Sequence, residues 1–405
     1  MKILLINSVY KVGSTGKIID CLGEVLRSKG HEVRICYGIG DKHYDKFSIK
    51  ICSNWEHKLN ALLMRIRGIP YGGVFISNRR FYRIIDNFKP DVVHVHCINA
   101  SMINVYHLFN YLGKKKIKTV VTLHAEIYHT AGCEHAFDCE KFKTGCHNCT
   151  SYNRKSWIFE RSMVSWQKMF NAFNSFHSDC LSITAVSPWL TKRAEQSAIL
   201  RKYKVVYVPN GLDTTIFHYY PSKGLIDRGG FQGVILYVTA VFSLNETDQK
   251  GGRYIPELAR LMPQYKFVVV ASQSSVASFE RLPYNVQFWG RAQSQYELAQ
   301  LYSEADVTLI LSRREAFSMV TAESLCCGTS VVGFKAGGPE SIVISDYFSF
   351  VEYGNISALA ESLDQRLKMN NDRDSLSGKA AKLYARERPA ELYIDIYDNL
   401  ISKKC

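Results

Sequence analysis

Short apolar segments recur along the first half of the chain, and the spacing between them leaves room for helices. These segments cover residues 3–7, 33–36, 91–96, 119–124, 181–186 and 204–208. Their nearly continuous and often β-branched character is typical of parallel strands that are covered by helices on both faces. The first half is therefore predicted to be an α/β domain with a doubly wound parallel sheet.

The same pattern restarts after a turn-forming stretch, Pro209-Asn210-Gly211. The later apolar segments cover residues 234–239, 266–271, 286–289, 306–311 and 330–334. A chain of 405 residues is long enough for two domains with separate cores. We expect a first domain over residues 1–208, a second over 209–387 and a C-terminal helix over about 388–405. The aromatic-rich residues 157–176 are predicted to form a packed helix.

The segment with the clearest candidate chemistry begins at the strand predicted over residues 306–311. Glu315 stands just beyond that strand, and a helix is predicted to open at residues 317–320. Glu323 lies in this helix, eight residues after Glu315, and Gly328 suits its left-handed cap. In a crossover unit of strand, helix and strand, ligands bind beyond the carboxyl ends of the strands.

Two carboxylates at this spacing, next to a helix start, suit a nucleotide sugar. An ionised carboxylate only accepts hydrogen bonds, and its two oxygens match the neighbouring hydroxyls of a diol. The first amides of a helix suit an anion such as a diphosphate. Those amides belong here to the stretch that contains Phe317, Ser318, Met319 and Val320. The two glutamates alone are also compatible with a surface helix whose side chains are solvated.

At this segment the chain resembles the retaining glycosyltransferases of family 4. Their shared signature is a glutamate, a phenylalanine, a second glutamate eight residues after the first, a glycine turn and a Gly-Gly-x-Glu. The matching residues are Glu315, Phe317, Glu323, Cys327, Gly328, Gly337, Gly338 and Glu340. Where those enzymes usually carry EGFG, this chain has EAFS, so Ala316 and Ser318 replace two glycines that favour close backbone approach to phosphates.

The resemblance implies the GT-B architecture, with two Rossmann-like domains facing each other across a cleft and the C-terminal helix packed back on the first domain. It also implies that Lys250 binds the donor phosphates, that Glu315 and His124 orient the sugar, and that Glu323 holds the ribose. Further donor contacts would come from the helix start at 317–320 and from Gly13 and Gly16. The arginine that usually precedes the lysine in the family is absent here, so Arg291, which follows Gly290, is predicted to supply a further cation for the phosphates. Catalysis in this family requires no metal ion or other cofactor.

Four cysteines lie within seventeen residues, spaced C-x5-C-x6-C-x2-C. They are Cys133, Cys139, Cys146 and Cys149, in an insert predicted over about residues 130–152. A cytoplasmic location argues against disulfides and favours a structural, tetrahedral zinc ion. Reduced thiols that pack the inserted loop are the alternative, because only the last pair has the usual zinc-knuckle spacing.

The net positive charge comes entirely from the first half of the chain. Residues 1–208 contain 31 Lys and Arg against 15 Asp and Glu, a net charge of +16. Residues 209–405 carry a net charge of −2, so the whole chain has a net charge of +14. An apolar set at helical spacing accompanies this charge and comprises Trp55, Leu59, Leu62, Leu63 and Ile66. A joint basic and apolar surface suits peripheral contact with an anionic membrane. The alternative is a core helix with a solvated basic face.

The first strand is too short for a signal peptide, and the apolar runs are shorter than the roughly 18 residues of a membrane span. The predicted location is therefore the cytoplasm, with peripheral contact at the inner face of the plasma membrane.

The predicted function is transfer of a sugar, with retention, from a nucleoside diphosphate sugar to a hydroxyl of a lipid-linked or polysaccharide acceptor in surface-glycan biosynthesis. A sugar nucleotide 2-epimerase of the same fold is an alternative. A basic nucleic-acid-binding protein is a less favoured alternative, because no nucleic-acid module accompanies the charge. No nucleic-acid partner is therefore expected.

Overall fold

The computed structural model describes residues 1–150, 152, 156–273, 282–370 and 372–404. The chain forms two compact units. Unit 1 comprises Met1–Gly211 and Arg386–Cys405, and unit 2 comprises Leu212–Ala385. The predicted boundaries, at residue 208 before the Pro-Asn-Gly turn and at residue 387 before the C-terminal helix, lie a few residues away.

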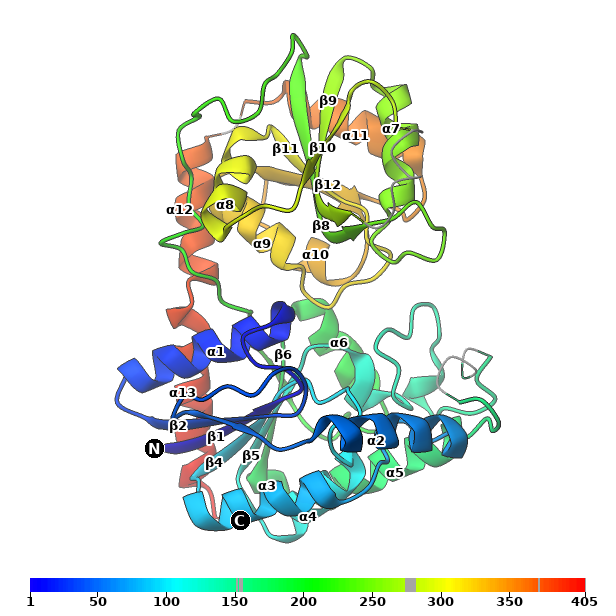
Figure 1. Ribbon diagram of the computed structural model, residues 1–405, viewed down its shortest axis with the longest axis vertical. Coiled ribbons are helices and arrows are strands. Elements are labelled where there is room, and N and C mark those ends of the chain that lie inside the picture. The colour runs from blue at the N-terminus through cyan, green and yellow to red at the C-terminus, as the bar shows by residue number, and fades with distance from the viewer. Residues whose placement is uncertain (151, 153–155, 274–281, 371, 405) are drawn as a thin grey trace. The chain divides into compact units, whose positions relative to one another are not determined.

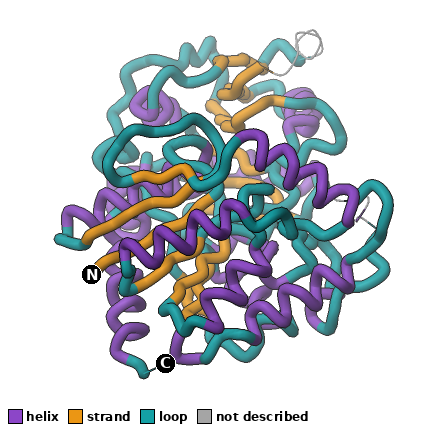
Figure 2. Tube along the Cα trace, turned by 60° about the horizontal axis from the view of Figure 1, so that its bottom comes forward, coloured by secondary structure: helices purple, strands orange, loops and turns teal. Residues whose placement is uncertain are grey.

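The sheet of unit 1 has seven strands in the order β3-β2-β1-β4-β5-β6-β7, and neighbouring strands are parallel. The strands are β1 Lys2–Asn7, β2 Glu32–Tyr37, β3 Ser48–Lys50, β4 Val92–Val95, β5 Thr119–Leu123, β6 Leu181–Ala185 and β7 Val205–Tyr207. The helices are α1 Gly13–Ser28, α2 Asn54–Arg67, α3 Ile76–Phe88, α4 Val105–Lys114, α5 Ser162–Asn174, α6 Pro188–Gln196 and α13 Glu387–Ser402. Figure 1 shows α1 on one face of this sheet and α3 and α4 on the other, and Figure 2 shows the strands side by side between helices.

The C-terminal helix α13 is part of the core of unit 1. Its Ala390, Tyr393, Tyr397 and Leu400 are buried among side chains of α1, β1 and β2. Because these positions recur every three or four residues, they form one apolar face of the helix. The hydroxyl of Tyr397 also lies 2.6 Å from Nδ1 of His94, which ties α13 to β4.

Unit 2 contains a six-stranded parallel sheet in the order β10-β9-β8-β11-β12-β13. Its strands are β8 Gly233–Phe242, β9 Tyr265–Gln273, β10 Val286–Gly290, β11 Val307–Ile310, β12 Ser330–Phe334 and β13 Phe348–Val351. Its helices are α7 Ile255–Leu261, α8 Gln295–Glu304, α9 Met319–Cys326, α10 Gly338–Ser341, α11 Ile356–Lys368 and α12 Arg373–Tyr384. Two parallel sheets covered by helices confirm the predicted α/β class.

Three details differ from the sequence predictions. The short strands β3 and β13, at one edge of each sheet, were not predicted. The helix expected over residues 157–176 begins only at Ser162. The amide of Phe159 donates to Oγ of Ser156 at 3.1 Å, and this turn holds the chain outside a helix before α5. The prediction was therefore wrong for residues 157–161 and for residues 175 and 176, which follow the end of α5 at Asn174.

Candidate active site

An ion pair joins two loops at the carboxyl ends of β8 and β11 in unit 2. The Nζ of Lys250 lies 2.9 Å from Oε1 of Glu315. The Glu315 side chain is 15% exposed and the Lys250 side chain 48%, so the pair is open to solvent from the lysine side. The nearby charge of Glu315 raises the pKa of Lys250, which keeps the ammonium charged at neutral pH. Ser312 supports the pair with a short hydrogen bond from Oγ to Oε1 of Glu315.

The backbone next to Lys250 approaches β11 so closely that only glycine fits. Gly251 has a φ of +77°, and a Cβ at this position would lie 2.3 Å from the carbonyl oxygen of Leu311. A larger residue would therefore push Lys250 away from Glu315. The hydroxyl of Tyr237 donates to the carbonyl oxygen of Lys250 at 2.8 Å and fixes the same loop from β8.

The Gly-Gly-x-Glu turn holds Glu315 from the other side. The amide of Glu315 donates to the carbonyl of Ala336 at 3.0 Å, and the amide of Gly338 donates back to the carbonyl of Glu315 at 2.9 Å. A Cβ on Gly338 would lie 2.5 Å from the carbonyl carbon of Ala316. The carboxylate of Glu340 accepts from the amides of Ala336 and Gly337 at 3.0 and 2.7 Å. Glu340 therefore stabilises the turn that positions Glu315.

Helix α9 begins at Met319, two residues later than the start of the predicted range. Ser318 is its N-cap and accepts from the amide of Thr321 at 3.3 Å. Ser318 has a φ of +84°, a backbone region that favours glycine. The position that usually carries glycine in the family thus keeps a glycine-like conformation here. The amides of Met319 and Val320 lie in the first turn, at the positive end of the helix.

Phe317 is a buried residue of unit 2. Its ring meets the ring of Tyr384 edge to face, with centroids 6.0 Å apart. The side chain therefore anchors the segment between Glu315 and α9 to α12.

Glu323 lies in α9 with its side chain partly exposed. The hydroxyl of Tyr302, from α8, donates to Oε2 of Glu323 at 3.0 Å. Burial and the neighbouring carboxylate raise the pKa of Tyr302, so the phenol stays protonated and donates. Tyr302 was not identified from the sequence, because it occupies a buried position of an ordinary helical pattern.

Gly290 and Arg291 end β10 at the outer edge of the sheet. Gly290 has a φ of +91°, and Arg291 is exposed. Strand β9 separates β10 from β8, so Arg291 lies two strands away from the strand that precedes Lys250. The residues share the carboxyl edge of the sheet, and the donor contact of Arg291 stays a prediction.

In unit 1, the glycine loop that follows β1 becomes the first turn of α1. Gly13 opens the helix with a φ of +64°. A Cβ on Gly16 would lie 3.2 Å from a methyl carbon of Val9 and 3.3 Å from the amide of Lys11. The amide of Lys11 donates to the carbonyl of Gly16 at 3.1 Å, so the loop folds tightly over the helix start.

His124 belongs to a histidine cluster at the carboxyl ends of β4 and β5. Its Nε2 lies 3.1 Å from Nδ1 of His96, and the rings of His94 and His96 are 3.9 Å apart. Burial lowers the pKa of His124 to about 4, so the imidazole is neutral at physiological pH. Nε2 of His94 shares a hydrogen bond of 2.7 Å with Thr122. His94 and His96 were missed because they alternate with valines inside an apolar strand.

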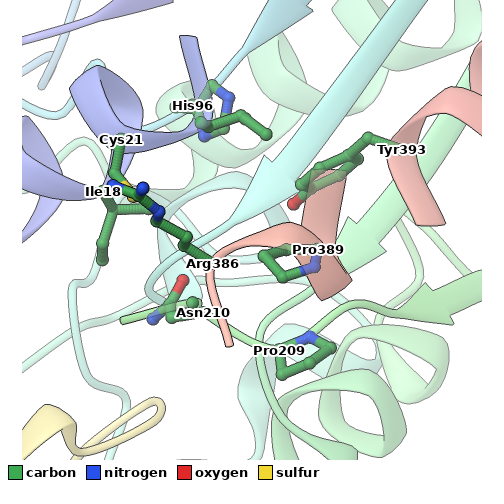
Figure 3. A pocket seen from close by; sticks show the side chains of 10 residues that line it. Ile18, Cys21, His96, Pro209, Asn210, Arg386, Pro389 and Tyr393 are labelled. Atoms are coloured by element: carbon green, nitrogen blue, oxygen red, sulfur yellow. The ribbon is translucent and has the colours of Figure 1, made fainter. Parts of the chain in front are cut away.

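One small pocket of unit 1 opens beside this cluster. Figure 3 shows His96 facing residues of α1, of the stretch after β7 and of α13. The pocket is lined by Ile18, Cys21, Leu22, His96, Pro209, Asn210, Gly211, Arg386, Pro389 and Tyr393. The buried His96 has an Nε2 atom without a hydrogen-bond partner among the described residues. This nitrogen is available to a polar ligand.

The four cysteines of the insert line a second pocket of unit 1, together with Phe142 and Tyr152. The pKa of Cys146 is raised to about 12, chiefly by burial; a backbone hydrogen bond from Ala131 opposes the shift and the other three thiols add to it. The thiols thus converge on one pocket. However, no group of three or more His, Cys, Asp or Glu side chains within the described part of the chain is arranged to hold a metal ion. Binding of zinc would require the four thiols to move closer together. The zinc site therefore stays a prediction.

Glu126 attaches the same insert to α6. Its carboxylate is fully buried, 2.7 Å from Nε of Arg193, and it accepts from the amide of Ala136 at 2.7 Å. Burial favours the neutral acid, but His129, Arg193 and that amide outweigh burial and lower the pKa of Glu126 to about 2. The carboxylate is therefore ionised and structural.

Comparison with known proteins identifies the class to which this fold and site belong. The structure is similar to sucrose-phosphate synthase from Thermosynechococcus elongatus, with a TM-score of 0.68, 17% identity and 99% of each chain covered. It is also similar to Anabaena HepE in complex with UDP-glucose, with a TM-score of 0.65, 14% identity, and 98% of this chain and 99% of that chain covered. These likenesses show a GT-B fold.

Two family models match the sequence. The model for Glycosyltransferase Family 4 matches residues 16–216, and the model for Glycosyl transferases group 1 matches residues 253–383. The two matches together cover most of the chain, which therefore belongs to the glycosyltransferases of the family 4 type.

Curated relatives match over shorter stretches. A D-inositol 3-phosphate glycosyltransferase of Segniliparus rotundus is 36% identical over 150 residues, 33% of this chain and 32% of the relative. An N-acetyl-alpha-D-glucosaminyl L-malate synthase of Bacillus anthracis is 27% identical over 107 residues, 26% of this chain and 28% of the relative. Each match thus spans about a third or less of the relative.

Proposed function

We propose that this protein transfers a sugar from a nucleoside diphosphate sugar to an acceptor hydroxyl, with retention of the anomeric configuration. The observation that carries the proposal is the grouping of Lys250, Glu315 and the first turn of α9 at the carboxyl edge of one parallel sheet. Cations and helix-start amides suit a diphosphate, and a partly exposed carboxylate in the same helix suits a ribose diol. Anabaena HepE, which has the same fold, binds UDP and UDP-glucose in its solved structures, and this supports a donor of this class.

Catalysis in this proposal depends on stabilising the departing diphosphate. The charge of Lys250 and the amides of Met319 and Val320 would offset the negative charge that develops on the leaving group. Glu323 would accept from the ribose hydroxyls, with Tyr302 holding the carboxylate in place. Glu315 would position Lys250 and accept from a sugar hydroxyl. A neutral His124 would donate to or accept from the transferred sugar.

We propose a lipid-linked or polysaccharide acceptor in surface-glycan synthesis. One structural neighbour is titled a lipopolysaccharide outer core galactosyltransferase, with a TM-score of 0.64 and 14% identity. The curated relatives are named for smaller acceptors, malate and inositol 3-phosphate. The experiment must therefore compare a large acceptor with these small ones.

The test is product analysis with UDP-, GDP- and ADP-sugars, each with and without a synthetic lipid-linked sugar. We expect a glycosylated lipid whose new linkage keeps the donor's anomeric configuration in the NMR spectrum. An inverted linkage contradicts the proposal, as does a failure to consume any donor with both this acceptor and a polysaccharide acceptor. Conversion of the donor sugar into its 2-epimer without acceptor would establish the epimerase instead.

A further inference from the structure

The fully buried residues of helix α2 are polar. Of its fourteen residues, only Glu56 and Asn60 are buried. The exposed residues include Trp55, Leu62 and Ile66. A helix of a water-soluble domain normally turns its apolar stripe inward. Here Trp55, Leu62 and Ile66 form an apolar stripe that faces outward, whereas Leu59 and Leu63 are half-buried.

Specific hydrogen bonds fix this orientation. The carboxylate of Glu56 accepts from the amide and the hydroxyl of Ser77 at 2.7 and 2.6 Å and from Arg80 at 2.8 Å. The amide side chain of Asn60 donates to the carbonyl of Ser101 at 3.1 Å and accepts from the amide of Val74 at 2.8 Å. A rotation of α2 would break all of these bonds and leave a buried carboxylate unpaired. The outward apolar stripe is therefore built into the fold.

A second apolar segment continues this stripe at the C-terminal end of α2. The amide of Trp157 donates to the carbonyl of Arg65 at 3.0 Å, and the guanidinium of Arg65 lies 5.4 Å from the centre of the Trp157 ring. Residues 157–159 and the first turn of α5 expose five large apolar side chains. They are Trp157 at 62%, Ile158 at 60%, Phe159 at 45%, Met163 at 61% and Val164 at 43%.

Basic residues are interleaved with these apolar ones. Lys58, Arg65 and Arg67 are exposed on α2. The guanidinium of Arg161 lies 4.6 Å from the centre of the Phe159 ring. Glu160 is the one exposed acidic residue of α2 and residues 157–164, and its carboxylate accepts from the amide of Ser162 at 3.0 Å. We call α2 and residues 157–164 together the apolar-basic surface.

We propose that the apolar-basic surface binds an anionic lipid bilayer. Soluble monomers rarely expose so many large apolar side chains in continuous segments. Tryptophan and aliphatic side chains suit the headgroup boundary, while long basic side chains reach the phosphates around them. No helix within the described residues is long and apolar enough to cross a membrane. This proposal concerns a surface remote in sequence from Lys250 and Glu315, and it stands without the proposed donor.

The experiment is co-sedimentation of the full chain with vesicles of phosphatidylcholine alone and of phosphatidylcholine with phosphatidylglycerol. We expect binding to the vesicles that contain phosphatidylglycerol, with weaker binding at high ionic strength and a blue shift of tryptophan emission. The double variant Trp157→Ser, Phe159→Ser should bind at least about tenfold more weakly. The variant Leu62→Ser, Ile66→Ser tests α2 in the same way.

Leu383→Ser is the matched control, because Leu383 is an exposed apolar residue outside the surface and should leave binding unchanged. Circular dichroism establishes that each variant is folded. Absence of binding to phosphatidylglycerol vesicles overturns the proposal, as does binding that the two double variants leave intact. A dimer in light scattering that these variants dissociate would assign the surface to a second copy of the chain and would also overturn it.

Discussion

The ammonium of Lys250 lies 2.9 Å from the carboxylate of Glu315, and this contact joins the loop after β8 to the loop after β11. Both loops leave the carboxyl edge of the same sheet. Removal of the lysine should therefore affect the reaction far more than the fold, because a partly exposed pair contributes about 0–1 kcal/mol to stability.

We expect Lys250→Met to lower kcat by roughly 10²–10³-fold, the usual effect of losing one group that stabilises a leaving anion. The melting temperature should change little. Lys368→Met is the control, because Lys368 forms a largely exposed pair with Asp364 within α11. Steady-state kinetics with saturating donor measure the effect. A wild-type kcat in Lys250→Met removes the lysine from the mechanism.

Two small substitutions of Ser318 should change the free energy of unfolding in opposite directions. Ser318→Gly should stabilise the protein by up to about 1 kcal/mol, because glycine adopts a φ of +84° without strain and loses only a few tenths as an N-cap. Ser318→Ala should destabilise it by about 1 kcal/mol, because alanine keeps the strain and loses the bond to Thr321. Urea denaturation measures both free energies of unfolding. If both variants change the free energy of unfolding by the same amount in the same direction, Ser318 is not a strained N-cap.

Glu126 predicts a pH-dependent stability. Its pKa is lowered from 4.5 to about 2 in the folded protein, so its contribution is present above about pH 4.5 and is lost as the pH falls toward 2. Glu126→Gln should cost about 3 kcal/mol at pH 7, the free energy that corresponds to this lowering of the pKa, because Arg193 loses its fully buried carboxylate partner and keeps only the half-exposed Glu140. The difference in melting temperature from wild type should shrink on acidification.

Glu140→Gln is the matched control for Glu126→Gln. Glu140 contacts the same Arg193 at 3.2 Å, but its side chain is half exposed. This variant should lie close to wild type. Thermal unfolding from pH 2 to pH 7 measures both variants, and a difference for Glu126→Gln that stays constant over this range contradicts the assignment.

The cysteine pocket predicts bound metal. If zinc draws Cys133, Cys139, Cys146 and Cys149 together, protein purified without chelator carries one equivalent, and Cys146→Ser loses it. Cys326→Ser is the control, because Cys326 is buried in α9 of unit 2. Elemental analysis measures the zinc content of each protein. If wild-type protein contains far less than one equivalent of zinc, the zinc site is wrong and the cysteines are reduced thiols that pack the insert.

Sequence reasoning found the strands because buried parallel strands are apolar along their whole length. It predicted Glu315 and Glu323 from their spacing beside a helix start, and the resemblance added Lys250. It missed Tyr302 and His96, whose hydrogen bonds depend on which helices and strands lie side by side. Such neighbours are set by the sheet order, and no local pattern records them.

The orientation of α2 shows the same limit. Apolar residues at helical spacing gave two interpretations, a core helix or a membrane-facing one. The outward direction of Trp55, Leu62 and Ile66 is fixed by Glu56, which is held by Ser77 and Arg80 from α3, more than twenty residues away in sequence. An isolated helical pattern contains no information about such partners.

The measurement that tests the central claim most directly is calorimetric titration of the nucleotide sugar that wild type binds best, chosen from UDP-, GDP- and ADP-sugars. Glu323→Ala should bind it roughly 10–100-fold more weakly, because charge-assisted hydrogen bonds of about 1.5–3 kcal/mol are lost. Glu361→Ala, which removes an exposed carboxylate of α11, should bind as wild type does. Equal affinities for wild type and Glu323→Ala would contradict the assignment of this site to a nucleotide sugar.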